Sequence, residues 1–501
     1  MAHEKEIIRD TSIFTVARYS AYFFTILTGL VIAKVLGPAS FGVYSALMLI
    51  VTYSHYSHFG LLFAMTKKVP FYMGKKEYNK AKETENIVFS GMIIIIFFIS
   101  LALIIASFFI KNLDNHTINS LRIVAIVVIF QQIFYFYQYY LRSEKKFFLF
   151  GKILLVYSIT YFIFIILLIM RFRLEGVFFA MLLAYIIAIF YLSKKDEFKL
   201  RIKVMPKNTV QLMKIGFPLL MLGTMALFFV SIDKIMIIKF MDKVQLGYYS
   251  FAAIVAGIVS FIPQGIGSII FPHLLEKYGE KEDKAHIKNY LFQPTLIISY
   301  LLPIVVGLVF ITAPVAIYYI LPKYLPGIMP FKILICAIFF MSVTSASNNF
   351  LITLNKEKKM LSLQAISVII AIILNYFFII NGYGINGVAI ATAISYFFYS
   401  TCILIYSFRH YIPRITQLIK FFVKIYLPFL YIILILILSN FIPITGNLLR
   451  DIFLTALKLV IFMVFSLPLI WIVNKKTGIV KTFFDMIFLR FIKNNKNKEH
   501  Y

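Results

Sequence analysis

The stretch NGYGINGVAIATAISY, residues 381–396, has a degenerate copy earlier in the chain, RFRLEGVFFAMLLAY at residues 171–185. A shift of 211 residues lays one over the other, and the matched pairs are Gly176 with Gly387, Val177 with Val388, Ala180 with Ala391 and Tyr185 with Tyr396. Similarity at a fixed separation is the sequence signature of an internal repeat. The two phrases therefore indicate a duplicated fold.

A second pair of segments supports the duplication. A shift of 205 residues lays IAKVLGPASFGVYS (32–45) over IIKFMDKVQLGYYS (237–250). The identical positions are Ile32, Lys34, Gly42, Tyr44 and Ser45, which match Ile237, Lys239, Gly247, Tyr249 and Ser250. Hydrophobic segments resemble one another by composition, so neither pair is decisive by itself. Two pairs in the same order and at nearly equal shifts predict a repeated unit.

Composition places that unit in a membrane. The chain has 501 residues, of which 61% are hydrophobic and 14% charged, and its mean hydropathy is +0.89. So little polar surface could not cover a soluble core, and backbone groups in lipid must be satisfied within their own segment. The predicted fold class is therefore an all-α polytopic membrane protein. We predict fourteen spans, near residues 13–33, 41–65, 87–110, 119–141, 149–170, 177–193, 215–240, 246–271, 289–311, 331–353, 362–380, 387–408, 421–442 and 452–473.

The repeat covers six spans in each copy, and the last two spans lie outside it. Because six is even, both copies enter the membrane from the same side, which is the parallel-repeat arrangement of some secondary transporters. The predicted organisation is an N-terminal six-helix lobe (1–193), a cytoplasmic linker (194–214), a C-terminal six-helix lobe (215–408), two additional helices (421–473) and a basic cytoplasmic tail (474–501).

The net charge of +29 is distributed by topology. Segments on the N-terminal side of the predicted membrane hold 35 of the 50 Lys and Arg residues, the alternate loops hold seven, and eight lie within spans. This bias follows the positive-inside rule and predicts a multi-pass protein of the cytoplasmic membrane with both termini in the cytoplasm. A nucleic-acid partner is therefore not expected. Cys336 and Cys402 both fall inside spans, which excludes a disulfide framework.

Four segments carry a resemblance to a known group, namely VLGPASFGVYS (35–45), MTKKVPFYMGKKEYNKAKE (65–83), SIDKIMI (231–237) and GYGINGVAIATAISY (382–396). The sequence resembles the polysaccharide-exporting flippases of the multidrug/oligosaccharidyl-lipid/polysaccharide (MOP) superfamily, which also contains the MATE exporters and the peptidoglycan lipid flippases. The resemblance covers the first twelve spans in order. It implies a carrier that moves a lipid-linked (polyprenyl-pyrophosphate) oligosaccharide across the membrane by alternating access of two lobes.

Charged residues inside the spans suit such a cargo. The predicted spans contain one acid, Asp233, and eight basic residues, Arg18, Arg122, Lys152, Lys234, Lys239, Lys332, Lys424 and Lys458. Charges in hydrocarbon are expensive and usually functional, and Arg suits bidentate phosphate binding. We predict a cationic substrate-binding cavity formed by Arg18, Lys34, Arg122, Lys234 and Lys239.

Each of these residues also has a plainer interpretation. Arg122 lies near a span end and can extend to the headgroups instead. Lys34 and Lys239 occupy equivalent repeat positions, which places them either across the lobe interface or at the membrane edge. Arg18 lies among small and hydroxylated residues in FTVARYSAY, and the resemblance implies a first-helix Arg of this kind in the cavity.

Asp233 is the predicted coupling or latch residue. Neighbours on a helix point about 100° apart, so Asp233 and Lys234 are not expected to pair directly. Three roles stay open for the carboxylate: a latch between lobes, a proton-coupling group, and a fixed interhelical ion pair.

Two other function classes compete with the flippase. The alternative is a MATE-like small-molecule or cation antiporter, although the chain has no acid between Asp10 and Glu77, where such exporters commonly carry one. A membrane enzyme usually needs a large outer loop or an intramembrane cluster of His and Asp. No catalytic residue, metal or cofactor is expected, and His55 with His58 lacks a third ligand. The expected partners are the polyprenyl-linked oligosaccharide and membrane lipid, with a monomeric state and an open choice of proton or sodium gradient.

Overall fold

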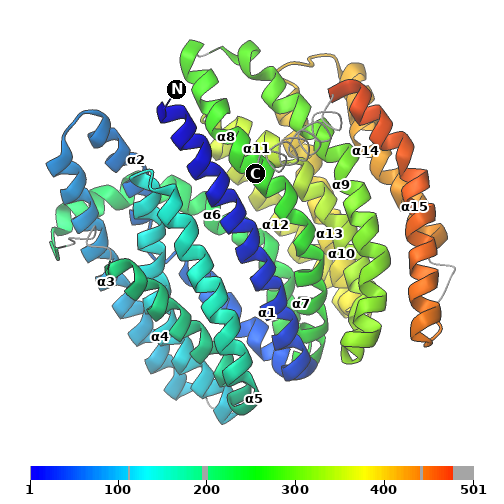
Figure 1. Ribbon diagram of the computed structural model, residues 1–501, viewed down its shortest axis with the longest axis horizontal. Coiled ribbons are helices and arrows are strands. Elements are labelled where there is room, and N and C mark those ends of the chain that lie inside the picture. Colours follow the sequence, from blue (N-terminus) through cyan, green and yellow to red (C-terminus); the bar gives the residue numbers. More distant parts are fainter. Residues whose placement is uncertain (1, 111–112, 195–200, 282, 440–443, 478–501) are drawn as a thin grey trace, which may run out of the picture. The chain divides into compact units, whose positions relative to one another are not determined.

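The computed structural model describes residues 2–110, 113–194, 201–281, 283–439 and 444–477 (Figure 1). Part of the predicted linker (195–200) and most of the predicted basic tail (478–501) lie outside the described residues. The chain divides into two compact units, unit 1 (Met1–Phe251) and unit 2 (Ala252–Tyr501). The described residues form helices and contain no strand, which confirms the all-α fold class.

Unit 1 is a bundle of long helices. Its elements are α1 (Ala2–Ser54), α2 (Leu61–Gly74), α3 (Tyr78–Phe109), α4 (Asn115–Ser143), α5 (Phe147–Ser193), α6 (Pro206–Phe240) and the first part of α7 (Lys243–Gly257). Figure 1 shows α3, α4 and α5 side by side, and α5 also packs along α1. Because α6 packs against α1, α2 and α3, it belongs to the contacts of unit 1, beyond the predicted lobe boundary at residue 193.

Unit 2 contains the remaining helices. After the end of α7 these are η1 (Ile258–Ser260), α8 (Phe261–Lys281), α9 (Lys284–Ile320), η2 (Pro322–Gly327), α10 (Ile328–Val343), α11 (Ser345–Thr353), α12 (Glu357–Ile380), α13 (Gly384–Phe408), α14 (Ile415–Ser439) and α15 (Leu448–Thr477). Here α13 packs against α10 and α12, while α9 packs against α10, α14 and α15.

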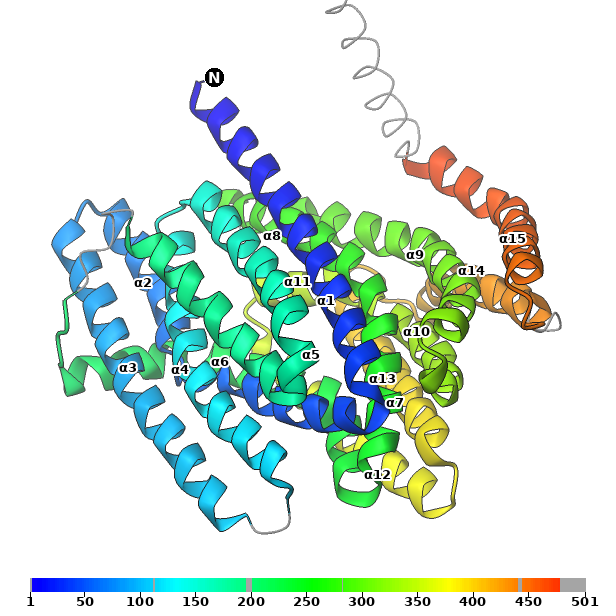
Figure 2. The same ribbon diagram turned by 60° about the horizontal axis from the view of Figure 1, so that its bottom comes forward.

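The predicted spans are all present, although two pairs of them share one helix. Within the described residues, twelve helices are long and apolar enough to cross a membrane. Two of the twelve, α1 and α5, contain a sharp bend at Gly37 and at Arg173, and each bend separates two predicted spans. Figure 2 shows the turn in α1. Fourteen spans are therefore accommodated, and the connections after spans 1 and 5 are shorter than separate helices would suggest.

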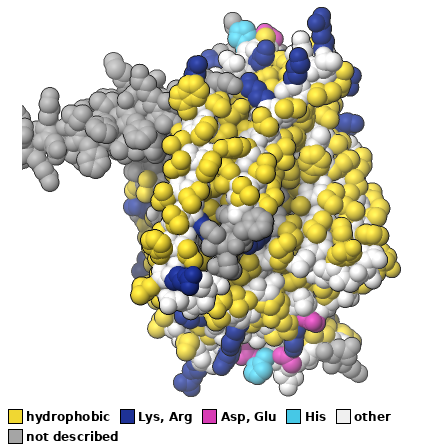
Figure 3. Space-filling view, turned by 90° about the vertical axis from the view of Figure 1, so that its right-hand side faces the viewer, with side chains coloured by type: hydrophobic (Ala, Val, Ile, Leu, Met, Phe, Trp, Pro, Cys, Tyr) yellow, Lys and Arg dark blue, Asp and Glu magenta, His cyan; other side chains and the backbone are white. Residues whose placement is uncertain are grey.

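The outer surface of the helices agrees with a lipid environment. The face shown in Figure 3 is hydrophobic over its middle, and its charged side chains gather toward the two ends. Large apolar residues are exposed along the last two helices, among them Leu427, Leu434, Phe465 and Trp471. Such a surface would be unstable in water and is normal against hydrocarbon. The chain is a polytopic membrane protein.

The two copies of the repeat share a positive φ and a glycine contact at equivalent positions. Arg173 and Gly384, which the shift of 211 equates, both have positive φ, 46° and 56°. Three residues later, Gly176 and Gly387 face equivalent neighbours, because a Cβ on either would crowd the Cβ of the residue four positions earlier, at 3.1 Å and 2.6 Å. A non-glycine residue rarely adopts positive φ. The shared positive φ and the equivalent glycine contact support a repeat in structure as well as in sequence, and the copies differ at Gly382, which has φ 79° where Arg171 does not have positive φ.

Candidate substrate-binding site

The predicted spans 2 and 7 pack closely within unit 1. Gly60 is the N-cap residue before α2 and lies against Gly216 of α6, and a Cβ on Gly216 would overlap the carbonyl oxygen of Gly60. Farther along the same two spans, the hydroxyls of Tyr53 and Ser231 lie 2.6 Å apart and share a hydrogen bond. Small residues at such contacts let helix backbones approach each other in membranes. This packing holds α6, the helix that carries Asp233 and Lys234, against α1 and α2.

A second close approach joins the two copies of the repeat. A Cβ on Gly42 would overlap the carbonyl oxygen of Lys243, and a Cβ on Gly247 would overlap that of Pro38. The shift of 205 equates Gly42 with Gly247 and Pro38 with Lys243. The contact is therefore reciprocal, as it would be about a local two-fold axis. The repeated sequence phrases thus meet each other at this end of unit 1.

Asp233 lies in a closed polar environment. Its side chain is buried, and Oδ2 accepts a hydrogen bond from the Tyr249 hydroxyl at 2.6 Å. Its Oδ1 accepts the backbone N–H of Lys234 at 2.7 Å. Since Tyr249 is on α7, the carboxylate ties α6 to α7 across the turn between them. Among the described residues it makes no ion pair, so the fixed interhelical ion pair is not the arrangement seen here.

Lys234 and Arg18 are half-buried, and neither forms an ion pair with a described residue. Arg18 Nε donates to the hydroxyl of Tyr22 at 2.7 Å, one turn along the same helix, and its guanidinium carbon lies 5.5 Å from that ring's centroid. A buried cation without an acidic partner needs water or an anion nearby. Both residues therefore have the unpaired charge that an anionic cargo requires.

The other three predicted cavity residues lie near helix ends. Lys34 and Lys239 are exposed, and the Lys239 ammonium is 5.2 Å from the ring centroid of Phe240. Arg122 turns toward α3, where its Nε donates to the Ser107 hydroxyl at 3.2 Å and its guanidinium carbon lies 4.5 Å from the Phe108 ring centroid.

The six predicted site residues all belong to unit 1 but do not form one contact cluster. Within the described part of the chain, the hydrogen bond from the Lys234 backbone to Asp233 is the one contact between any two of them. Arg18 precedes Lys34 on α1 by sixteen residues, which corresponds to about 24 Å along a helix. Their membership of one cavity stays a prediction.

Sequence reasoning did not identify the partner of Asp233. Tyr249 is matched with Tyr44 by the repeat, and in unit 1 it is fully buried. A buried hydroxyl that follows a buried acid across a short turn is a usable signal, because both groups must find a partner when they leave water. The repeat singled out Tyr249 as the match of Tyr44. Its hydrogen bond to Asp233 was found only in the three-dimensional structure.

The fold and the charged spans define a polytopic membrane protein built from repeated helical halves, an architecture found among transporters. The model of a family described as polysaccharide biosynthesis protein matches residues 31–324, more than half of the chain. The protein belongs to this family. A sequence comparison with curated proteins finds no match.

Three solved structures illustrate the fold. One is a multidrug resistance MATE family transporter of the MOP superfamily in an inward-facing conformation, with TM-score 0.64 and 14% identity over 78% of this chain and 97% of that one. Another is the lipid II flippase MurJ, with TM-score 0.66 and 19% identity over 91% and 99%. The third is a MOP superfamily transporter from Pyrococcus furiosus, with TM-score 0.56 and 13% identity over 80% and 94%. The chain has the MOP-superfamily fold.

Proposed function

We propose that the protein is a flippase that moves a lipid-linked, polyprenyl-pyrophosphate oligosaccharide across the cytoplasmic membrane for surface polysaccharide synthesis. The observation that carries the proposal is the match of residues 31–324 to the polysaccharide biosynthesis family. Supporting it, the MurJ structure covers 91% of the chain and the MATE structure 78%, so the likeness in fold extends further with the flippase. A transporter role requires no catalytic residue, and we do not expect an enzyme.

The charges of unit 1 support an anionic cargo. A pyrophosphate cannot enter hydrocarbon without cationic or hydrated partners. Asp233 is the one acid in the predicted spans, and its hydrogen bonds with Tyr249 and the Lys234 backbone leave it no ion pair. Lys234 therefore keeps its charge available. We assign Arg18, Lys34, Arg122, Lys234 and Lys239 to successive contacts of the headgroup as two lobes, 1–193 and 215–408, alternate their access.

An apolar groove in unit 2 suits the lipid part of the cargo. It has a volume of about 450 Å³ and is lined by residues of α9, α10, α13 and α14, including Phe340, Phe429, Ile433 and Leu436. Lys332 lies at the same groove. Transfer of a hydrocarbon chain from a lipid bilayer into such a groove exchanges one apolar environment for another, so it carries little penalty. The additional helix α14 thereby acquires a role in holding the polyprenyl chain.

Asp233 has a structural role first and a coupling role second. Its bond to Tyr249 fixes the turn between α6 and α7 in the observed state. As a latch it would exchange this partner for a cation of the opposite lobe during transport. As a coupling group it would take up a proton when that bond opens. We further propose that a proton or sodium gradient drives transport, that the protein is a monomer and that both termini lie in the cytoplasm.

The test is glycan export in cells that depend on this protein. Arg18→Ala and Asp233→Ala should each abolish surface-glycan export while the protein remains in the membrane, because each removes a charge at the proposed transport path. Lys152→Ala is the control, since the Lys152 ammonium lies 4.2 Å from the ring centroid of Phe148 near a helix end and should not matter for export. Normal export with Arg18 and Asp233 substituted together would remove the site assignment.

A second assay separates the flippase from the antiporter. Purified protein in liposomes is given a fluorescent lipid-linked oligosaccharide, and its appearance in the opposite leaflet is measured. The same liposomes are tested for efflux of a cationic dye under a proton or sodium gradient. Translocation of the lipid without dye efflux supports the proposal. Gradient-driven dye efflux without lipid translocation would replace it with the MATE-like alternative.

A further inference from the structure

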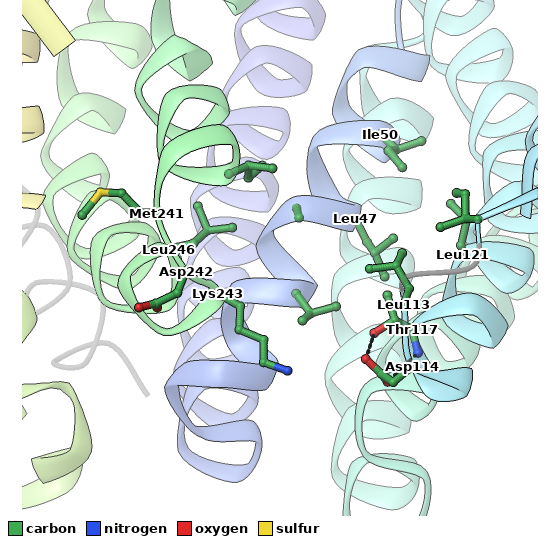
Figure 4. A pocket seen from close by; sticks show the side chains of 15 residues that line it. Leu47, Ile50, Leu113, Asp114, Thr117, Leu121, Met241, Asp242, Lys243 and Leu246 are labelled. Carbon is green, nitrogen blue, oxygen red and sulfur yellow. Dashed lines mark hydrogen bonds between the residues drawn. The ribbon is translucent and has the colours of Figure 1, made fainter. Parts of the chain in front are cut away.

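Two adjoining cavities lie at one end of unit 1, and Figure 4 shows the first of them. The first, of about 500 Å³, is mainly apolar and is lined by side chains that include Leu47, Ile50, Leu113, Leu121, Met241 and Leu246. The second, of about 450 Å³, has charged side chains in its lining, which includes Asp114, His116, Arg171, Arg173, Glu175 and Lys243. Val43, Asp114, Thr117 and Lys243 line both. We refer to the two cavities together as the outer pocket.

The outer pocket lies where the chain turns back on the side opposite the N-terminus. Its polar residues come from the connections that follow predicted spans 1, 3, 5 and 7. The charge bias predicts this to be the outer face, whose loops hold only seven of the 50 Lys and Arg residues. Three of those seven, Arg171, Arg173 and Lys243, line this single pocket. Cations are therefore concentrated where topology otherwise disfavours them.

The carboxylates of the pocket have partners of their own. Asp114 caps the start of α4, where its side chain accepts the Thr117 backbone N–H at 3.1 Å and the Thr117 hydroxyl at 2.9 Å. Glu175 Oε1 lies 3.1 Å from His116 Nδ1. Figure 4 shows Asp114 and Thr117 on one side of the apolar cavity and Asp242 and Lys243 on the other.

The three cations remain available to a ligand. Within the described part of the chain, neither arginine nor Lys243 has an acidic oxygen within ion-pair distance. All three are exposed at the pocket. The lining holds three carboxylates as well, Asp114, Glu175 and Asp242, and Asp242 Oδ1 accepts the backbone N–H groups of Val244 and Gln245. The carboxylates are thus bonded within their own turns or to His116, and the three cations are not held in ion pairs with them.

The strained backbone at Arg173 indicates that its side chain has a function. Arg173 has φ 46° and ψ −120°, a conformation that is strained for any residue with a Cβ and costs on the order of 1–3 kcal/mol. In the other copy of the repeat the equivalent position is Gly384, which adopts positive φ freely, and Gly382 before it has positive φ as well. The second-copy counterparts of Arg171, Arg173 and Glu175 are Gly382, Gly384 and Asn386. The fold thus makes this bend without charge, and the charges of the first copy serve something other than the bend.

We propose that the outer pocket binds a lipid whose headgroup ends in a phosphate or pyrophosphate. The Arg171 and Arg173 guanidinium groups and the Lys243 ammonium receive the phosphate oxygens, and the first carbons of the hydrocarbon chain enter the apolar cavity. Guanidinium groups match phosphate in charge and in fork geometry. The adjoining apolar cavity distinguishes a lipid from a free anion. The site adjoins the outer end of the proposed transport path, where Lys239 precedes Lys243 by four residues, and it is far from Arg18, because Gly37 at the bend is roughly 28 Å along α1 from Arg18.

Binding to the full-length protein in detergent tests the proposal. The probes are a polyprenyl phosphate, the polyprenol of the same chain length and inorganic phosphate. We expect the polyprenyl phosphate to bind at least about tenfold more tightly than either of the others. Arg171→Gln with Arg173→Gln should lower that affinity by about tenfold or more. Equal affinity of the double variant and the unchanged protein would overturn the site, and full displacement of the lipid by equimolar inorganic phosphate would overturn its lipid character.

Three variants keep the result interpretable. Lys323→Gln removes another outer basic residue, exposed in unit 2, and should leave binding unchanged. Arg173→Gly removes one phosphate ligand and also relieves the strained backbone, so it should fold at least as well as the unchanged protein and still bind more weakly. Arg18→Ala should retain binding at the outer pocket even where glycan export is lost. The outer site and the transport function can therefore fail separately.

Discussion

Residues 171–176 and residues 382–387 turn the chain at equivalent positions in the two copies of the repeat, with different chemistry. The first reads RFRLEG and the second GYGING, and their third residues have φ 46° and 56°. One copy carries three charges on a strained backbone, whereas the other carries none on a backbone that glycine adopts freely. The comparison separates what the bend needs from what has been added to it. A side chain present in one copy only is a candidate for function.

The opposite case is the contact between Gly42 and Gly247. These residues are equivalent in the two copies, and each lies against the backbone of the other copy's phrase. Neither position can acquire even a methyl group without a backbone shift. Here the copies agree because the fold requires it. We infer that residues identical in the two copies are required by the fold, and that charged residues present in one copy only serve function.

The largest expected effect is at this glycine contact. Gly247→Ala places a Cβ on the carbonyl oxygen of Pro38, and overpacking against backbone costs about 3 kcal/mol or more. We expect a marked loss of thermal stability in detergent, measured by the melting temperature. Gly29→Ala is the matched control, because a Cβ on this α1 residue meets nothing within 4 Å. Equal melting temperatures for the two variants would mean that the close approach is absent.

The fold could be predicted from sequence because lipid imposes simple rules on it. Span length and apolar composition follow from bilayer thickness, and the repeated phrases revealed the duplication. The sequence predicted a loop between spans 1 and 2 and between spans 5 and 6, whereas the helix continues through a sharp bend at Gly37 and at Arg173. Composition alone does not distinguish a short loop from such a bend.

The charged sites were less predictable because their residues come together from distant parts of the chain. Asp233 and Lys234 were visible as intramembrane charges, whereas the Tyr249 partner depends on how α6 and α7 pack. The outer pocket joins residues from four separate connections. In the sequence its arginines could be recognised only as charged residues of a loop. The direction of a side chain could not be predicted either. Arg122, for example, contacts Ser107 and Phe108 on α3.

A second difference between the copies lies at Asp233, whose first-copy counterpart is Thr28. Thr28 is buried and its hydroxyl donates to the Phe24 carbonyl at 2.8 Å within its own helix. Asp233→Thr would make the copies alike at this position and remove the carboxylate that accepts the Tyr249 hydroxyl and the Lys234 backbone N–H. We expect glycan export per membrane-inserted protein to fall by about tenfold or more, since the buried Tyr249 hydroxyl loses its acceptor and the coupling or latch carboxylate is gone. Thr28→Ala should change export little, and an equal loss in both would deny Asp233 any special role.

Exchanging the residues at the bend tests the comparison in both directions. Arg173→Gly should raise the free energy of unfolding by about 1 kcal/mol while weakening polyprenyl phosphate binding. Gly384→Arg should lower stability by about 1–2 kcal/mol, because it forces a Cβ into positive φ, and should create no new binding. Melting temperatures and the lipid-binding assay measure the two effects. Stability and binding that change in the same direction in Arg173→Gly would show that this side chain supports the fold instead of a ligand.

The smallest expected effect concerns Asp114, the acid that caps α4 at the edge of the outer pocket. Burial acts against ionisation, but the hydrogen bonds from Thr117 outweigh it and hold the pKa of Asp114 below its usual 3.8. Its contribution to stability is therefore present above that usual value and is lost as pH falls through the depressed pKa.

Asp114→Asn keeps a good N-cap and removes the negative charge that faces Lys243. Stability at neutral pH should then change by less than about 0.5 kcal/mol, while affinity for the polyprenyl phosphate rises by roughly threefold. Asp114→Ala is the comparison variant, because it removes both the charge and the cap and should lower stability by about 1 kcal/mol. Weaker lipid binding in Asp114→Asn at full stability would mean that the carboxylate, not the three cations, faces the ligand.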